Sequence, residues 1–180
     1  MGQAERKYAA YYIVEQWEHW QDKWELIFGV PYCMSPAPSI RHQEVNLAIL
    51  SQLKESLRNS ACRKCKVLMP VDWQISEDTV VQPDVLIVCK PVKGNRLTET
   101  PEVVFEVLSP STDQKDRTEK FELYRRAGVK YYVLVDPLEE NVEAFELKSP
   151  EFYAPLPIEK SLLFKIDGCD VRLELELIWE

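Results

Sequence analysis

The stretch that decides the fold is PEVVFEVLSPSTDQKDRTEKFELYRRAGVKYYVLVDP, residues 101–137. It opens with a β-branched, apolar run over residues 102–108, which predicts a buried strand. The charged segment that follows predicts a helix over residues 114–127, ended by Gly128, because glycine is the usual residue just past a helix C-terminus. A second apolar run at residues 130–137 predicts another buried strand.

Further short elements are expected on both sides of this unit. In chain order they are a helix over 5–20, two strands within 24–34 turned at Gly29-Val30-Pro31, a helix capped by Ser39 with an apolar stripe of Val45, Ile49, Leu53 and Leu57, strands over 67–75 and 80–88, and, after the unit, strands over 141–147, 161–166 and 171–179. Helices and strands mixed in this order predict an α/β fold of the α+β kind, a central mixed sheet flanked by helices, with an N-terminal helix and hairpin. We expect one domain over residues 1–180.

The composition limits the partners of the chain. A net charge of −8 excludes a broad nonspecific surface for nucleic acids or acidic membranes, so any contact with a polyanion must be local. No apolar run reaches the length of about 18 residues that a spanning helix requires, and no signal peptide is evident. We therefore expect a cytoplasmic protein without a membrane partner.

The chain has five cysteines, an odd number, and shows no export signal, and both observations favour reduced thiols over disulfides. Cys62-Arg-Lys-Cys65 has the spacing of a zinc-ligand pair, but the chain has no second such pair. The favoured interpretation is two surface thiols near a helix end. A zinc module built on Cys62 and Cys65 is the alternative.

Asp84 and Glu106 are acids within strands that are otherwise apolar. Because alternate residues of a strand share a face, Asp84 shares its face with Leu86 and Val88, and Glu106 shares its face with Val104 and Leu108. If the two strands form a hairpin centred on Asn95, position 84 lies opposite position 106. Two facing carboxylates on an apolar surface need a compensating cation, either a divalent metal or a lysine.

The helix after Ser109-Pro110 can supply the lysine. Asp113, Arg117, Lys120 and Tyr124 follow helical spacing and form one stripe that can reach the end of the Glu106 strand. Two acids and an ammonium group together suit metal-assisted phosphodiester chemistry. The alternative is ordinary surface charge, with Asp116 and Lys120 forming an i, i+4 pair worth about 0.2–0.5 kcal/mol.

The segments QPDVLIV, PEVVFEVLSPST and DRTEKFELYRRAGVKYYVLVDP resemble the Uma-type family of restriction endonucleases, within the PD-(D/E)XK nuclease superfamily. The resemblance covers most of the chain and implies a restriction-endonuclease-like PD-(D/E)XK core. It implies that Asp84 and Glu106 are catalytic residues that bind the metal, Mg²⁺ or Mn²⁺. The superfamily lysine position is Leu108 here, so the resemblance places the catalytic lysine on the following helix at Lys120, with Tyr124 one turn further on.

The resemblance extends to positions outside these three segments. SPAPSIRHQEV is similar to the family's first helix, whose histidine matches His42, and Glu44 is the nearest candidate for an additional acid; a hydrogen-bonded histidine and a capping acid are the alternatives. The family's Gly-Val-x-Glu-Tyr-Trp is Gly128-Val129-Lys130-Tyr131-Tyr132-Val133 here, so that its acid and tryptophan are lost.

The predicted function is hydrolysis of DNA phosphodiester bonds by a divalent-metal-dependent endonuclease. The alternative is a catalytically silent protein of the same fold that binds nucleic acid or a protein partner, which Leu108 and the acidic net charge favour. A homodimer is expected from geometry, since a duplex has two strands to cut.

Overall fold

The computed structural model describes residues 10–34, 37–60 and 62–180. Its helices and strands are, in chain order, α1 (Val14–Trp17), β1 (Trp24–Ile27), β2 (Val30–Cys33), α2 (Ile40–Asn59), β3 (Lys66–Leu68), β4 (Trp73–Ser76), β5 (Thr79–Val81), β6 (Val85–Val88), β7 (Val103–Val107), α3 (Asp113–Lys115), the π-helix η1 (Asp116–Lys120), α4 (Phe121–Ala127), β8 (Tyr131–Asp136), β9 (Asn141–Ser149), β10 (Phe152–Pro155), β11 (Ser161–Ile166), β12 (Cys169–Glu174) and the 3₁₀-helix η2 (Glu176–Ile178).

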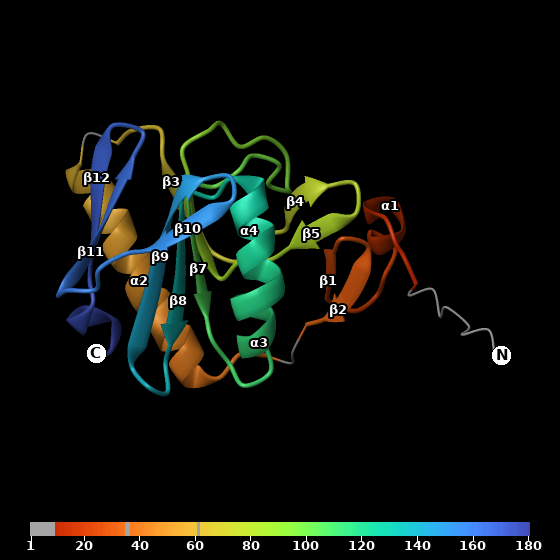
Figure 1. Ribbon diagram of the computed structural model, residues 1–180, viewed down its shortest axis with the longest axis horizontal. Coiled ribbons are helices and arrows are strands. Elements are labelled where there is room, and N and C mark those ends of the chain that lie inside the picture. The colour runs from red at the N-terminus through yellow and green to blue at the C-terminus, as the bar shows by residue number, and fades with distance from the viewer. Residues whose placement is uncertain (1–9, 35–36, 61) are drawn as a thin grey trace.

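The centre of the molecule is a six-stranded mixed sheet in the order β10-β9-β8-β7-β6-β3. Strands β7 and β8 are parallel, and α3, η1 and α4 form the crossover between them, while the other neighbours are antiparallel. In Figure 1 this helix lies on one side of the sheet, and α2 with the β11–β12 hairpin lies on the other. The predicted mixed sheet flanked by helices is confirmed.

Successive side chains of the central strands point to opposite faces of the sheet, so the interior has two cores, one on each face. Val85 and Ile87 of β6 pack toward α2 and β11–β12, whereas Leu86 and Val88 pack toward α4. On β7, Val104 faces α4. The α4 side also receives the apolar residues of the helix, so the acids that share this face lie beneath the crossover helix.

A second sheet, β2-β1-β5-β4, carries the N-terminal hairpin beside the crossover helix (Figure 1). The predicted hairpin is present, but its turn lies at Phe28 and Gly29, both with positive φ. Such a two-residue turn matches the twist of the two strands. Pro31 lies on the edge strand β2, where a missing backbone donor is tolerated.

Two predicted strands are each divided between the two sheets. The expected strand 80–88 is broken after β5 and resumes as β6, and the expected strand 67–75 ends with β3 and resumes as β4. Pro83 explains the first break, because proline cannot donate to a ladder. The chain therefore leaves one sheet at Val81 and enters the other at Val85, with Asp84 at the entry.

Other boundaries also differ from the prediction. Within the predicted helix 5–20 only α1 is helical among the described residues, and residues 5–9 lie outside them. The apolar alternation of 171–179 is a strand only to Glu174 and then becomes η2, while β10 was not predicted. No helix within the described residues is long and apolar enough to cross a membrane.

The cysteines contradict the expected reduced surface thiols. Cys62 and Cys65 are buried, and they form disulfides with Cys169 and Cys89, at sequence separations of 107 and 24 residues. Only packing of distant segments makes these pairs, so spacing along the chain could not reveal them. Sulfur atoms in disulfides are not thiolate ligands, so the alternative of a zinc module on Cys62 and Cys65 would need the reduced chain. Cys33 is free and exposed.

Candidate active site

Asp84 and Glu106 lie opposite each other at one end of the β6–β7 ladder. The pair Val85↔Phe105 is the last of the antiparallel register, and one further step brings position 84 opposite position 106. The predicted hairpin symmetry is confirmed. Asp84 Oδ2 accepts a hydrogen bond from the backbone N–H of Val107 at 2.8 Å, so β7 itself holds this carboxylate in place.

Lys120 reaches Glu106 from the crossover helix. Its Nζ lies 2.9 Å from Glu106 Oε1, and the Tyr124 hydroxyl donates to the same oxygen at 2.6 Å. Lys120 and Glu106 are each only 3% exposed. The structure thus brings together the strand acid and the two helix residues that the sequence predicted.

The helix presents these residues through a π-turn. Residues Asp116 to Lys120 form η1, which adds one residue to the turn and shifts the faces of the helix. As a result Asp116, Lys120 and Tyr124 point to the buried site, whereas Arg117 contacts Asp113 and Glu143 at the surface. The predicted single stripe of Asp113, Arg117, Lys120 and Tyr124 is therefore wrong in its first half.

Glu25 is a third acid in the site that the sequence analysis missed. It comes from β1 of the second sheet, and its Oε1 lies 2.9 Å from Lys120 Nζ. Its Oε2 lies 2.5 Å from Lys115 Nζ, and the backbone N–H of Gln82 donates to Oε1 at 2.9 Å. The signal was available, because Glu25 is an acid within the apolar strand WELI.

Asp116 is a fourth acid, and it is not the surface partner that i, i+4 spacing suggested. Its side chain is buried, and its Oδ1 lies 3.5 Å from Lys120 Nζ without a hydrogen bond. The Tyr132 hydroxyl donates to its backbone oxygen at 2.8 Å. A buried carboxylate oxygen without a partner is costly, so this atom can accept a further cation or donor.

His42 also reaches the site, from the first turn of α2, which Ser39 caps. Its Nε2 lies 3.3 Å from Asp84 Oδ2, and its Nδ1 lies 3.1 Å from Asn46 Nδ2. Glu44, the other residue suggested for this helix, is exposed and pairs with Arg41 at 3.8 Å. The candidate site therefore includes His42, and Glu44 contacts none of its acids.

Burial and crowding set the protonation of the buried groups. Burial raises the pKa of Glu106 well above its ordinary value, although Lys120 opposes this, and burial likewise raises the pKa of Asp116. Burial lowers the pKa of Lys120, but the neighbouring acids, Glu106 first and then Glu25, outweigh burial and raise it; burial raises the pKa of Glu25, but Lys120 and Lys115 outweigh it, so that the pKa of Glu25 falls. Glu25 and Lys120 thus form the ionised pair of this site.

The neighbouring Asp84 raises the pKa of His42. Burial lowers its pKa, but the hydrogen bond and charge of Asp84 outweigh burial and raise the pKa overall. The Asp84 side chain is 20% exposed, compared with 3% for the whole Glu106 residue. Asp84 is therefore the side of the site that is open to solvent, and a ligand would approach there.

The donor set suits a hard divalent cation. Four carboxyl groups face two ammonium groups and one imidazole, and Asp116 Oδ1 has no hydrogen-bond partner among the residues that the structure describes. As the side chains stand, no group of three or more His, Cys, Asp or Glu residues within the described parts of the chain is arranged to hold a metal ion. Mg²⁺ needs only one or two carboxylates, because water and substrate phosphates complete its shell. Asp84 and Glu106 are the two carboxyl groups that the sequence analysis expected to bind the metal.

Comparison with known protein families decides the relationship. Residues 9–169 match the Uma2 family, whose description is "Putative restriction endonuclease". The chain belongs to the Uma2 family. The matched part of this Uma2 chain runs from residue 9 to the first residue of β12, so both sheets and the crossover helix lie within it.

A solved structure shows the same fold. The structure, titled as a putative nuclease belonging to DUF820 from Anabaena variabilis ATCC 29413, superposes on this Uma2 chain with a TM-score of 0.73 at 16% sequence identity. The match covers 93% of this chain and 97% of the Anabaena chain. The restriction-endonuclease-like fold is thereby confirmed. The curated proteins contain no match to this chain.

Proposed function

We propose that this Uma2 chain is a divalent-metal-dependent endonuclease that hydrolyses phosphodiester bonds of DNA. One observation carries the proposal: the Lys120 ammonium group lies 2.9 Å from Glu106, whose register partner is Asp84. A lysine beside two facing acids suits metal-assisted phosphodiester hydrolysis, because the acids can hold the metal and the ammonium group can stabilise developing negative charge. Membership of a family described as restriction endonucleases supports the same chemistry.

Asp84 and Glu106 would hold the Mg²⁺ or Mn²⁺ ion. The ion, when bound, makes water more acidic and neutralises charge on the scissile phosphate. Lys120 positions the Glu106 carboxylate and supplies a positive charge next to the developing negative charge. Tyr124 restrains Glu106, while the Val107 N–H and His42 restrain Asp84.

The two sheets share the task of orienting Lys120. Glu25 on β1 and Glu106 on β7 each lie 2.9 Å from its Nζ, so the ammonium group is held between the two sheets. Lys115 neutralises the other oxygen of Glu25. Glu25 is therefore a positioning residue for the lysine in this proposal.

A cleavage assay tests the proposal. The purified chain is incubated with supercoiled plasmid DNA and with RNA of matched length, in Mg²⁺, Mn²⁺ or EDTA. We expect DNA cleavage with either metal, no cleavage in EDTA, and a loss of at least about 100-fold in Asp84→Ala, Glu106→Gln and Lys120→Met.

Glu99→Gln is the matched control, because Glu99 lies in the β6–β7 connection and contacts only Lys90 among the described ion pairs, at 3.9 Å. This variant should cleave at the wild-type rate. Unchanged cleavage by Asp84→Ala would reject the assignment, and cleavage of RNA alone would reject DNA as the substrate.

A catalytically silent nucleic-acid- or protein-binding protein is the second candidate. The observation in its favour is that Lys120 and Glu106 satisfy each other while nearly excluded from solvent, with Leu108 in the superfamily's lysine position. Isothermal titration separates the two candidates. Heat of binding for Mg²⁺ or Mn²⁺ at millimolar concentration, lost in Asp84→Ala, supports the enzyme; no binding supports the silent protein.

Cutting both strands of a duplex calls for two active sites, so the proposal includes a two-fold homodimer. Light scattering of the chain with and without a short duplex measures its mass. A mass of two chains per duplex supports the dimer, and one chain per duplex rejects it.

A further inference from the structure

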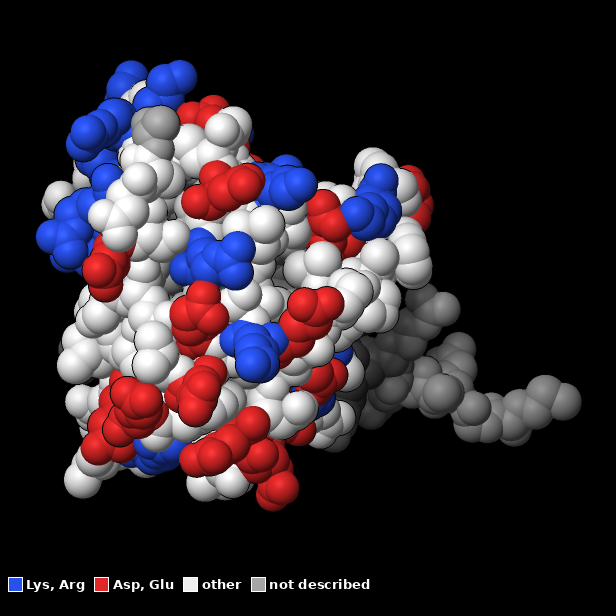
Figure 2. Space-filling view, turned by 90° about the vertical axis from the view of Figure 1, so that its left-hand side faces the viewer, with Lys and Arg blue, Asp and Glu red and all other residues white. Residues whose placement is uncertain are grey.

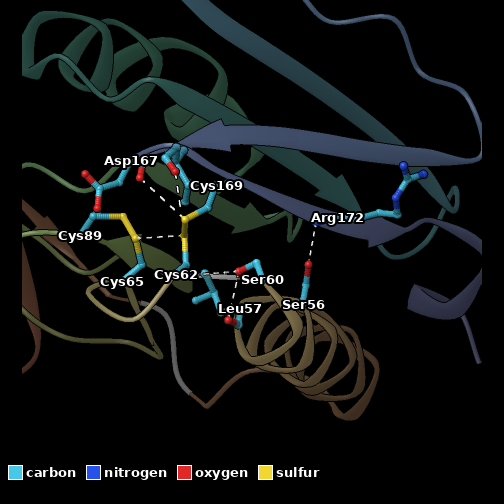
Figure 3. The surroundings of a disulfide bond; sticks show 10 residues. Ser56, Leu57, Ser60, Cys62, Cys65, Cys89, Asp167, Cys169 and Arg172 are labelled. Carbon is cyan, nitrogen blue, oxygen red and sulfur yellow. Dashed lines mark hydrogen bonds between the residues drawn. A yellow bond between two sulfur atoms is a disulfide. The ribbon is translucent and has the colours of Figure 1, made fainter.

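Four of the five cysteines gather at the end of β6 that lies away from Asp84 (Figure 3). Cys62 and Cys65 follow α2, Cys89 follows β6, and Cys169 begins β12. In the structure they form two disulfides, and the sulfur atoms of Cys62 and Cys65, which belong to different disulfides, lie 3.9 Å apart. The four sulfur atoms therefore form one cluster.

We propose that the reduced chain binds one Zn²⁺ ion through the thiolates of these four cysteines. Structural zinc sites are tetrahedral, and Zn–S bonds of about 2.3 Å place neighbouring sulfur atoms about 3.8 Å apart. The 3.9 Å between Cys62 and Cys65 already matches such an edge. The Cys-x-x-Cys spacing of this pair is the usual one for two ligands on one loop.

The other two ligands supply the second pair that the sequence lacks as a motif. The β3–β6 ladder pairs Lys66 with Val88, so its next step brings Cys65 opposite Cys89. The turn before Cys169 has positive φ at Asp167 and Gly168, which places Cys169 at the first position of β12. Cys65 and Cys89 thus lie next to the ends of β3 and β6, Cys169 begins β12, and Cys62 lies three residues before Cys65.

The surroundings suit a tetrathiolate site, which carries a charge of −2. A groove of about 790 Å³ beside Cys62 and Cys65 is lined by four cationic residues, Lys54, Arg58, Arg63 and Lys66. Figure 2, which shows the left-hand side of the molecule in Figure 1, has a group of Lys and Arg side chains at its upper left, while most of the acidic side chains lie lower down. Neighbouring cations offset part of the negative charge of such a site.

A phosphine can reduce both disulfides to thiols. Each phosphine gives two electrons to one disulfide and takes the oxygen of one water molecule, whose two protons end on the two sulfur atoms. Two phosphines therefore convert the two disulfides into four thiols. Zn²⁺ then displaces four protons as it forms four Zn–S bonds.

Zinc and the disulfides connect the same three parts of the fold: the segment after α2, the end of β6 and the start of β12. The proposed metal site therefore preserves the cross-link when the thiols are reduced. It lies at the opposite end of β6 from Asp84, and it is independent of the proposed nuclease function.

Native mass spectrometry and metal analysis of the full chain test the site. The wild-type chain is reduced with a phosphine, freed of metal by a chelator and titrated with Zn²⁺ in the absence of oxygen. We expect one tightly bound zinc per chain. Titration with Co²⁺ should give thiolate-to-cobalt charge-transfer absorption that saturates at one ion per chain and disappears when one equivalent of Zn²⁺ is added.

Matched variants identify the ligands. Cys65→Ser and Cys169→Ser should lose the charge-transfer absorption, whereas Cys33→Ser, at the exposed free cysteine, and Glu106→Gln, at the other end of β6, should keep one ion per chain. Because buried cysteine variants can fail to fold, the wild-type titration decides by itself. A reduced wild-type chain that binds no zinc at equimolar concentration would overturn the proposal, as would loss of binding in Cys33→Ser.

Discussion

Two groups of ion pairs extend from the crossover helix in opposite directions. Lys120 lies 2.9 Å from Glu106 and 2.9 Å from Glu25, and all three residues are buried. Arg117, three residues earlier, lies 2.6 Å from Asp113 and 2.6 Å from Glu143, with its side chain 33% exposed.

The N···O distances of the two groups are alike, but their environments are opposite. Removing one partner from a buried pair leaves an uncompensated charge without water, which is strongly destabilising. Removing one partner from an exposed pair leaves a charge that water solvates. Distance alone therefore does not rank these interactions, and burial does.

The largest effect is expected for Lys120→Met. At neutral pH the substitution leaves the ionised, buried Glu25 carboxylate without the ammonium group 2.9 Å away, and it removes the cation beside Glu106, so the free energy of unfolding should fall by about 3–5 kcal/mol. Urea denaturation in EDTA measures it. Lys148→Met, whose side chain is 54% exposed, is the control and should change stability by less than about 0.5 kcal/mol. Equal losses in the two variants would contradict the ranking by burial.

Much of the buried site could be predicted from the sequence, although its residues lie in separate segments of the chain. Acids in apolar strands identified Asp84 and Glu106, and the symmetry of a hairpin gave their register, because strand alternation and pairing are simple periodic rules. The family resemblance then placed Lys120. These three residues lie on two strands and one helix, and the residues within each of these segments are enough to predict its secondary structure.

What the sequence did not predict depends on packing between segments. Glu25 joins the site from a different sheet, and the break at Pro83 decides which sheet receives Asp84. The π-turn that separates Arg117 from Lys120 has no reliable local signal. The cysteine cluster likewise depends on the position of β12 relative to β6.

Tyr124→Phe is expected to have the next largest effect. The substitution removes the 2.6 Å hydrogen bond to Glu106 and keeps the ring that stacks on Trp73, so stability should fall by about 0.5–1.5 kcal/mol while Glu106 is protonated and by about 1.5–3 kcal/mol at a pH that ionises it. Tyr132→Phe is the matched control, since its buried hydroxyl donates to a neutral backbone oxygen, that of Asp116, at 2.8 Å, and about 0.5–1.5 kcal/mol is expected. A larger loss in Tyr132→Phe, measured by the same denaturation, would contradict the role of Glu106.

Glu106→Gln should change how stability depends on pH. Because burial raises the pKa of Glu106 above its ordinary 4.5, the folded chain keeps a proton that the unfolded chain loses. Its stabilising contribution is present below pH 4.5 and is lost as pH rises through the folded pKa.

Glutamine has no such proton. The stability of wild type minus that of Glu106→Gln should therefore fall above pH 4.5, by up to about 1.4 kcal/mol per pH unit. Urea denaturation in EDTA from acidic to neutral pH measures the difference. A difference that stays constant, or that rises with pH, would contradict the raised pKa.

Arg117→Ala should have the smallest effect, although it removes two ion pairs at once. Hydrogen bonds to Glu143 and Asp113 raise the pKa of Arg117, but its side chain is 33% exposed, so water and salt screen most of the attraction. The expected loss is less than about 1 kcal/mol, and it should shrink further as NaCl is raised. Denaturation at low and high salt measures both quantities. If Arg117→Ala costs as much as Lys120→Met and the cost persists in high salt, burial is not what separates the two groups.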